Sequence, residues 1–238
     1  MTGGLLQLES AATKEEAAKI ADTLAALALA LPAEPLQDGL RERIAASLRG
    51  VRKARSAVLV IDMLNDHLTP GLPLEVARAR AIVPALVSRL DAARAGGVPV
   101  VYIVDQHEPG DPELEVWPTH NVSGTKGNEV WPPLAPKAGD TVVTKPSYSA
   151  FVGSKLDATL DGLGVDTLVL TGCLTEVGIL ATAMDALQRG YAVVVPPDAQ
   201  AGSGPVAENV AMTTLSMLAP FAPARRDRLA RAVDAGAR

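Results

Sequence analysis

The sequence predicts a doubly wound α/β domain, in which a mainly parallel sheet carries helices on both faces. Two observations support this prediction. Short Val/Leu/Ile runs recur from residue 56 onward, and helical stretches separate most of them. Strands that are apolar on both faces are typical of a parallel sheet covered by helices. Right-handed crossovers between such strands give a Rossmann-type, three-layer sandwich.

The individual elements follow from these runs and from the stretches between them. The longest connection without a pattern, 106–139, is predicted to be an active-site loop, because long loops in compact domains are usually functional. Strands are expected at 57–62, 98–105, 140–145, 167–172 and 192–197, and helices at 75–96, 155–164, 176–190 and 205–220.

The first 50 residues differ from the rest, and we expect them to form a helical N-terminal arm. They are rich in Ala and Leu with helical spacing, and Thr13 with Glu16 forms a capping-box pattern. The apolar faces of this arm need to pack on the main domain or on another subunit. The predicted domains are therefore the arm at 1–50 and an α/β domain at 51–238.

Composition excludes several classes of function. The net charge is −5 and 3% of the 238 residues are aromatic, whereas nucleic-acid binding favours basic stripes and stacking platforms. A single cysteine excludes an internal disulfide and fits a reducing compartment. The first ten residues do not resemble a secretory signal, and the most apolar helical stretch, 20–32, is short for a bilayer span. We expect a soluble, cytoplasmic protein that binds neither nucleic acid nor membranes.

Two charged residues come directly after predicted strands. Asp62 ends the run AVLVID and Lys145 ends the run DTVVTK. Ligands of an open parallel sheet bind just beyond the carboxyl ends of its strands, so these side chains are expected to pair across one crevice. The alternatives are a turn or helix cap at Asp62 and a solvated strand-end lysine.

A second group of polar residues has the composition of a metal site. Asp105 and His107 lie at the end of a strand, and His120 lies in the loop that follows. One carboxylate and two imidazoles leave coordination positions open for water or substrate, as in catalytic metal sites. Glu113 or Glu115 could add a fourth ligand. The alternative is a pair of solvated loop histidines.

Together these segments resemble the isochorismatase-like hydrolase superfamily, which includes nicotinamidases and other small-amide hydrolases. The resemblance covers about 56–218 and is carried by Asp62 in VIDMLND, Lys145 in KPSYSAF and the segment TGCLTEVGILATAMDA. It implies a hydrolase that cleaves an amide or ester bond of a small polar or cyclic substrate. It also implies homo-oligomers and no nucleotide cofactor.

The loop sequence WPTHNVSGTKGNEV resembles the metal-site loop of nicotinamidases. This resemblance implies Asp105, His107 and His120 as ligands of one divalent ion (Zn, Mn or Fe). It also implies that Trp117 lies against the substrate ring.

Three further residues are candidates for the pocket wall. Tyr148 and Phe151 follow Lys145 closely and are expected to line the pocket, the alternative being core packing. His67 stands where nicotinamidases have an aromatic residue that contacts the substrate ring. We expect it to touch a polar substrate or to lie on the surface.

The sequence departs from the family at the nucleophile. Most members use an Asp–Lys–Cys triad, in which the thiolate attacks a carbonyl carbon. Counting back four residues from Thr182 places the family cysteine at Gly178, whereas Cys173 lies five residues earlier. Cys173 is thus either an alternative nucleophile or a buried free cysteine.

Three functions remain open at this point. The apparent metal ligands favour an amidase in which water, activated by the metal or by Asp62, replaces the thiolate. The isochorismatase branch lacks the thiol and hydrolyses a vinyl ether, with the aspartate as proton donor. The glycine at 178 is also compatible with a binding or scaffold protein that has lost turnover.

Overall fold

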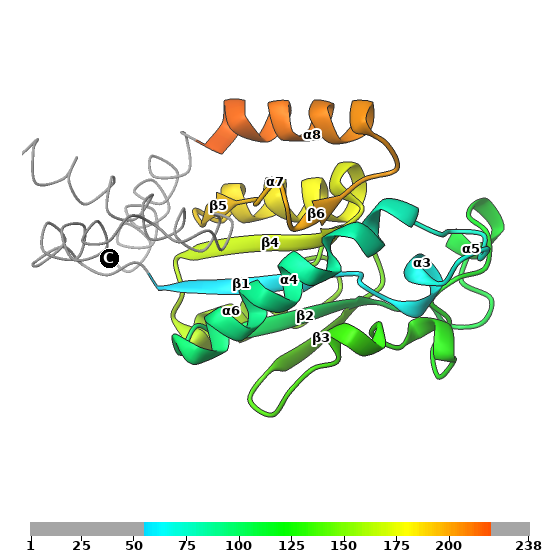
Figure 1. Cartoon of the computed structure of the whole chain (residues 1–238), viewed down its shortest axis with the longest axis horizontal. Coiled ribbons are helices and arrows are strands. Elements are labelled where there is room, and N and C mark those ends of the chain that lie inside the picture. The colour runs from blue at the N-terminus through cyan, green and yellow to red at the C-terminus, as the bar shows by residue number, and fades with distance from the viewer. Residues whose placement is uncertain (1–54, 220–238) are drawn as a thin grey trace, which may run out of the picture.

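The computed structural model describes residues 55–219, so the predicted helical arm at 1–50 lies outside the described residues. Within them, the strand order is β3-β2-β1-β4-β5, with β6 paired to β4, and all of these pairs are parallel (Figure 1). This confirms the predicted α/β fold. The strands are β1 (Ser56–Ile61), β2 (Val100–Asp105), β3 (Thr141–Lys145), β4 (Thr167–Cys173), β5 (Ala192–Val194) and β6 (Gln200–Ala201).

The central strands are buried on both faces, as their continuous apolar sequences require. All residues of β1, β2 and β4 are buried. Successive side chains of a strand point to opposite faces. In β1, Ala57, Leu59 and Ile61 therefore join one hydrophobic core, while Val58 and Val60 join the other. Two separate cores, one on each face, hold the three layers together.

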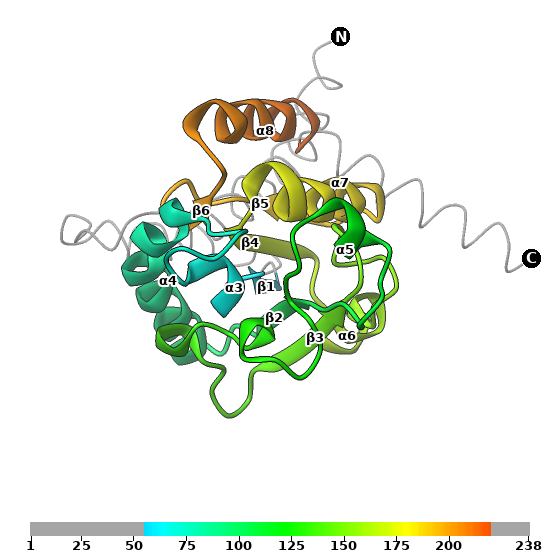
Figure 2. The same ribbon diagram turned by 90° about the vertical axis from the view of Figure 1, so that its right-hand side faces the viewer.

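Helices cover both faces of the sheet. Residues of α4 contribute to one core, and residues of α6, α7 and α8 contribute to the other. Figure 2 shows α8 on the outer side of α7. The helices are α3 (Asn65–Leu68), α4 (Ala77–Ala95), α5 (Glu113–Val116), α6 (Leu156–Leu163), α7 (Leu180–Gln188) and α8 (Pro205–Leu218), with 3₁₀ turns at Lys126–Asn128 and Pro132–Leu134 and a π turn at Thr175–Ile179. No helix among the described residues is long and apolar enough to cross a membrane.

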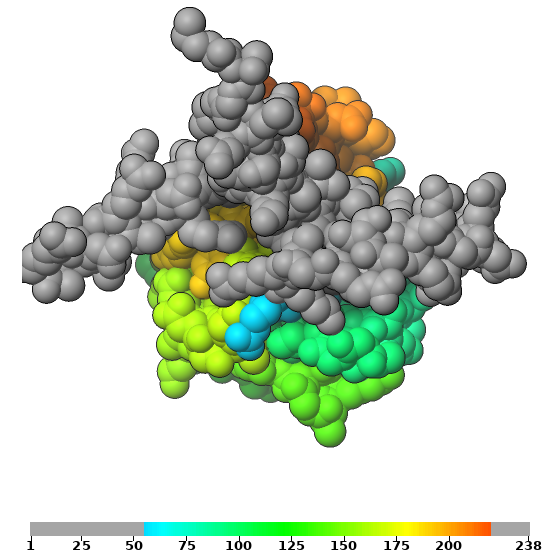
Figure 3. Space-filling view, turned by 90° about the vertical axis from the view of Figure 1, so that its left-hand side faces the viewer, coloured from blue at the N-terminus to red at the C-terminus, as the bar shows by residue number. Residues whose placement is uncertain are grey.

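The chain reverses its direction across the sheet between β1 and β4. From β1 it moves through β2 to β3, and then returns to place β4 on the other side of β1. Such a switch point leaves a crevice at the carboxyl ends of the two strands. At the other end of the domain, the chain that leads into β1 (cyan-blue) is exposed beside α4 (Figure 3).

A glycine allows the two central strands to approach closely at this crevice. Gly172 in β4 has a φ of 110°, and a Cβ there would collide with the carbonyl oxygen of Ile61 in β1. Because a residue with a side chain fits neither the φ value nor the space, only glycine suits this position.

Several elements differ from the prediction. The predicted strand 192–197 ends at Val194, because Pro196 and Pro197 cannot donate to a strand ladder. The loop 106–139 contains α5 and both 3₁₀ turns, and the short strand β6 was not predicted. The helix predicted at 176–190 is a π turn followed by α7.

Candidate active site

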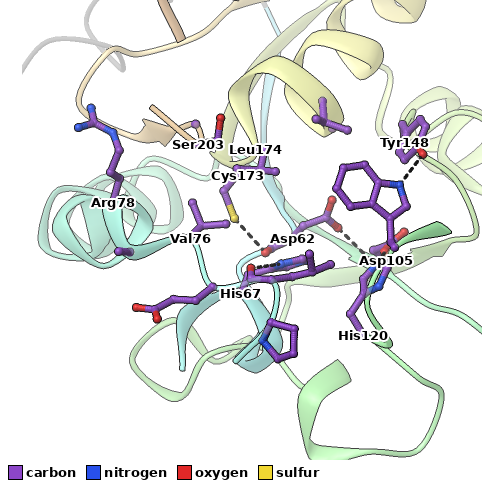
Figure 4. A pocket seen from close by; sticks show the side chains of 18 of the residues that line it. Asp62, His67, Val76, Arg78, Asp105, His120, Tyr148, Cys173, Leu174 and Ser203 are labelled. Carbon is purple, nitrogen blue, oxygen red and sulfur yellow. Dashed lines mark hydrogen bonds and ion pairs between the residues drawn. The ribbon is translucent and has the colours of Figure 1, made fainter. Parts of the chain in front are cut away.

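The carboxyl ends of the strands open into a cavity of about 370 Å³, shown from close by in Figure 4. Its walls come from the ends of β1 to β4, the start of α4 and the loops around α5 and β6. Predicted site residues that line it are Asp62, His67, Asp105, Glu113, Trp117, His120, Lys145, Tyr148, Cys173 and Gly178.

Lys145 lies between two carboxylates at the bottom of the cavity. Its Nζ is 3.0 Å from Asp62 Oδ2 and 3.0 Å from Asp105 Oδ1. The backbone N–H of Asp105 donates to Asp62 Oδ1 at 3.0 Å. All three side chains are buried. Three neighbouring strands therefore bring the charges together, and the predicted pairing of Asp62 with Lys145 is present.

The cluster has one positive charge for two carboxylates, and this affects its titration. Burial raises the pKa of Asp62 to about 6, an increase that Asp105 adds to and Lys145 opposes. Burial also acts to raise the pKa of Asp105, but hydrogen bonds from His120, Asn121 and Lys145 outweigh it and lower that pKa. Asp62 is therefore the carboxyl group that can exchange a proton near neutral pH.

The three predicted metal ligands converge. Their ligand atoms all lie within 4.8 Å of one another. Asp105 Oδ2 is 3.0 Å from His107 Nε2 and 3.6 Å from His120 Nε2. The other ring nitrogen of each histidine is also held, at 3.1 Å by Asp111 Oδ2 and at 2.7 Å by the carbonyl oxygen of Pro118.

This arrangement fits a divalent cation. A carboxylate with two imidazoles suits zinc, manganese or iron. Partners that fix the second ring nitrogen, here Asp111 and Pro118, are usual for metal-bound histidines. Sequence reasoning missed both partners. Glu113, proposed as a fourth ligand, lines the cavity but lies outside the converging group.

Aromatic residues form part of the cavity rim. The indole N–H of Trp117 donates to the hydroxyl oxygen of Tyr148 at 3.0 Å, and both residues are partly exposed (Figure 4). Phe151, in contrast, does not line the cavity as expected. It is buried in the core on one face of the sheet, beside Tyr191 and under the guanidinium of Arg189. The turn that follows β3 directs this ring inward, a direction that proximity to Lys145 does not reveal.

His67 lines the cavity and is buried, so the surface alternative is wrong. Its Nδ1 is 3.3 Å from the carbonyl oxygen of Leu74, which requires the proton on Nδ1. Its Nε2 then accepts from the side-chain amide of Asn121 at 3.0 Å, and that amide also donates to Asp105. Burial lowers the pKa of His67, in agreement with a neutral ring. Both ring nitrogens are therefore engaged within the protein. Sequence reasoning missed Asn121.

The two candidates for the nucleophile position have different surroundings. Cys173 is buried at the end of β4, before a cis peptide bond to Leu174, and its thiol donates to the carbonyl oxygen of Asp62 at 3.2 Å. Burial raises the pKa of this thiol, which disfavours a thiolate. A Cβ at Gly178 would lie 3.1 Å from Asp62 Oδ2. Gly178 thus faces the carboxylate directly.

Comparison with known proteins identifies the family. The family model described as Isochorismatase domain matches residues 56–225. The chain belongs to the isochorismatase family. This agrees with the predicted fold and with the order of strand-end residues around the cavity.

Curated relatives within the isochorismatase family include amide hydrolases. The ureidoacrylate amidohydrolase RutB of Azorhizobium caulinodans is 33% identical over 176 residues, covering 63% of this chain and 78% of that protein. A protein of Arabidopsis thaliana named "Probable inactive nicotinamidase" is 32% identical over 165 residues, covering 65% of this chain and 84% of that protein. Relatives at similar identity thus carry names for both active and inactive proteins.

One solved structure that the chain resembles contains a metal. The crystal structure of the pyrazinamidase of Pyrococcus horikoshii in complex with zinc aligns with a TM-score of 0.65 at 28% identity. The alignment covers 69% of this chain and 96% of that one. The present chain has the buried group Asp105, His107 and His120 as a candidate site for such an ion.

Proposed function

We propose that this protein is a small-molecule hydrolase that cleaves a C–N amide bond, or an ester bond, of a small polar or cyclic substrate. One observation carries the proposal. The buried Asp62 carboxylate is paired with Lys145, faces Gly178 and opens into a cavity of about 370 Å³. Amidohydrolases among the relatives support the same reaction class.

Gly178 leaves space beside the carboxylate for the atom that attacks. An oxygen at the place of the missing Cβ would lie 3.1 Å from Asp62 Oδ2, within hydrogen-bond reach. We propose that a water molecule there gives a proton to Asp62 as its oxygen attacks the carbonyl carbon. When the C–N bond breaks, Asp62 returns this proton to the departing nitrogen. Lys145 remains protonated and keeps the carboxylate in position.

Asp105, His107 and His120 would hold one divalent ion next to this carboxylate. When bound, such an ion supplies Lewis acidity and lowers the pKa of a coordinated water. Asp111 and Asn121 contribute by keeping the ligand side chains oriented. Trp117 and Tyr148, on the rim, would enclose the substrate from the solvent side.

The experiment is an ammonia-release assay on a panel of small primary amides, with purified protein and with Asp62→Asn. We expect at least one amide to be hydrolysed by the wild-type protein and none by the variant. Lys137→Ala serves as a control, because Lys137 is an exposed lysine paired with Asp91 away from the cavity. Equal turnover by wild type and Asp62→Asn would refute the mechanism.

A second candidate function is vinyl-ether hydrolysis with Asp62 as general acid. The pKa of about 6 favours it, because an appreciable share of Asp62 is then protonated near neutral pH. Gly178 is compatible with it, since no covalent nucleophile is needed. Metal analysis with activity before and after chelation separates the two reactions. Activity that survives complete metal removal would argue against a metal-assisted amidase.

A third candidate is a binding or scaffold protein that retains the cavity without turnover. Gly178 and the relative named as an inactive nicotinamidase motivate it. Turnover that Asp62→Asn abolishes would exclude this possibility. We also propose a homo-oligomer, which light scattering of the full chain would test.

A further inference from the structure

One side of α8 is exposed to solvent, yet it carries no charged residue. Figures 1 and 2 show α8 as the outermost helix on its side of the sheet, beyond α7. Val206, Val210 and Met217 are 77, 63 and 68% exposed. The remaining exposed residues of the helix are also uncharged: Pro205, Asn209, Thr213 and Ser216. We call these residues the outer face of α8.

A surface helix without exposed charge is unusual, because a helix that faces water normally carries charged and polar residues on its outer side. The one charged residue in the sequence of α8, Glu208, is buried and paired with Arg78. The hydroxyls of Thr214 and Ser216 donate to carbonyl oxygens of the helix itself, at 2.9 and 2.7 Å. Contiguous exposed apolar surface often marks an interaction site. The outer face of α8 is therefore suited to an apolar partner.

An apolar groove extends this surface towards the end of the domain where the described chain begins. It has a volume of about 150 Å³ and lies between the end of α7, β5 and the second half of α8, with Val193 and Leu215 in its wall. Ser216 belongs both to the groove and to the outer face. Val193 is in register with Leu168 of β4, and Leu168 with Ala57 of β1. Two strand spacings, about 10 Å, therefore separate the groove from the start of β1.

The predicted N-terminal arm contains a segment with a matching sequence pattern. Segment 13–31 lies outside the described residues, but its sequence has four large apolar residues at the spacing i, i+4, i+7, i+11: Ile20, Leu24, Leu27 and Leu31. Residues at this spacing share one face of a helix. A stripe on the outer face of α8 has the same spacing: Val206, Val210, Thr213 and Met217. Glu15, Lys19 and Asp22 would lie on the opposite side of a helix formed by the segment, so its apolar stripe needs a partner.

The size of the outer face distinguishes this segment from a second copy of the chain as the partner. Helix α8 has 14 residues and is about 21 Å long, so one side of it offers on the order of 200 Å². A stable interface between separate chains buries about 800 Å² on each partner. The outer face is thus too small to hold two copies together by itself. A segment tethered to the same chain binds as if present at about millimolar concentration, and therefore needs less area.

We propose that segment 13–31 packs its apolar stripe on the outer face of α8 in the same chain. The connection is long enough, because residues 32–54 could span up to about 75 Å if extended. The distance to cover is smaller, since the groove lies about 10 Å from the start of β1 and α8 is about 21 Å long. None of the outer-face residues lines the cavity, so this interaction goes beyond the proposed function.

The test is cross-linking, in the full chain, between cysteines placed on the two stripes. A chain with Leu24→Cys and Val210→Cys is treated with a short bismaleimide. The native Cys173 is 1% exposed, so it should not react in the folded protein. The control pair is Leu24→Cys with Val142→Cys, because Val142 is 51% exposed on the edge strand β3. We expect the first pair to link within one chain at least about tenfold faster, since docking raises the local concentration of one cysteine at the other.

A second measurement disrupts the contact with a charge. The rate at which a small maleimide alkylates Val210→Cys is measured in the full chain. Adding Leu24→Glu places a carboxylate in the apolar contact, and should raise this rate at least about tenfold. Ala26→Glu is the control, because it adds the same charge on the side of the segment that carries Lys19 and Asp22, and it should leave the rate unchanged.

Every other outcome overturns the proposal. A cross-linked product of twice the chain mass on a denaturing gel would show that a second copy covers α8. Equal rates for the two cysteine pairs would show that the segment does not dock on this face. Alkylation of Val210→Cys that Leu24→Glu leaves unchanged would show that another part of the chain, or nothing, covers the outer face.

Discussion

Two clusters of charged residues lie at opposite ends of the same parallel sheet, and they differ in burial and in how their charges are matched. At the amino ends of the strands, Arg94 donates to both carboxylate oxygens of Asp140, at 2.7 and 3.2 Å. At the carboxyl ends, one lysine, Lys145, is shared between Asp62 and Asp105. Arg94 also pairs with the exposed Asp91, which Lys137 neutralises in turn, so the first cluster is balanced. The second cluster has one carboxylate more than it has lysines.

The difference is visible in the titration of the two clusters. Hydrogen bonding to Asp140 raises the pKa of Arg94. Burial acts to raise the pKa of Asp140, but Arg94 outweighs it and the pKa is lowered, so that this pair stays charged. The pKa of Asp62 moves the other way, to about 6. A buried surplus of charge costs stability, and groups perturbed in this way cluster at functional sites. The carboxyl-end cluster is therefore expected to serve chemistry, and the amino-end pair to serve stability.

The largest expected effect is on turnover by Asp62→Asn. General acid–base catalysis contributes on the order of a hundred- to ten-thousandfold, so we expect a loss of about a thousandfold in kcat. The free energy of unfolding should stay the same or increase, because Lys145 keeps Asp105 as its partner and one buried carboxylate is removed. Steady-state kinetics and chemical denaturation measure the two quantities. A large loss of stability with little loss of kcat would reverse the roles assigned to the two clusters.

The matched change at the other end of the sheet is Asp140→Asn. The change removes the charge that accepts two hydrogen bonds from Arg94 and leaves Arg94 paired only with the exposed Asp91 among the described residues, and we expect a loss of about 2 kcal/mol in the free energy of unfolding. The value of kcat should stay the same, since Asp140 lies away from the cavity. Urea denaturation and the amide assay check both expectations. An unchanged stability would show that the pair contributes nothing.

The pH dependence of this variant has a defined sign. Because the pKa of Asp140 is lowered in the fold, its stabilisation is fully present above its ordinary value of 3.8 and is lost as the pH falls through the lower folded value. The difference in stability between wild type and Asp140→Asn should therefore be constant near neutral pH and shrink below about pH 4. A difference that grows in acid would contradict the assignment.

The sequence predicted the fold and the bottom of the site for one physical reason. Side chains at the ends of parallel strands meet at one edge of the sheet, so the pairing of Asp62 with Lys145 was predictable without coordinates. Asp105 was expected only as a metal ligand, and its ion pair with Lys145 was not predicted. Loop residues have no such constraint. His107 and His120 were grouped by their chemistry, and the partners of their second ring nitrogens, Asp111 and Pro118, were missed.

Residues whose role depends on side-chain direction could not be predicted. Phe151 follows Lys145 by six positions, yet a turn directs its ring into the core. Asn121 has a positive φ of 47° that allows its amide to reach both His67 and Asp105, and no sequence pattern signals this. Arg78 falls within the predicted helix 75–96, and its place at the cavity wall depends on where α4 begins.

A smaller effect is expected from Asp111→Asn, which tests a residue that contacts one of the candidate metal ligands in the carboxyl-end cluster. The change removes the charge of the group that holds His107 Nδ1 at 3.1 Å and leaves the three ligands in place. Outer partners of metal ligands typically contribute ten- to a hundredfold, so we expect metal affinity to fall about tenfold. Competition with a chelating dye measures it. Glu108→Gln is the control, because Glu108 is a nearby acid outside the ligand group. An equal fall in metal affinity for Glu108→Gln would show that Asp111 has no specific role.

The smallest expected effect is from Tyr148→Phe on the cavity rim. This change tests a hydrogen bond between two neutral side chains, in contrast to the two charged clusters. Trp117 and Tyr148 are both partly exposed, so water can replace the lost hydrogen bond and stability should change by less than about 0.5 kcal/mol. The indole would lose its tether over the cavity, and we expect KM to rise about threefold with kcat unchanged. Tyr191→Phe, which alters a tyrosine outside the cavity, should change neither kinetic constant. A fall in kcat as large as that of Asp62→Asn would place the Tyr148 hydroxyl at the reacting atoms, and the rim would then belong to the chemistry rather than to substrate enclosure.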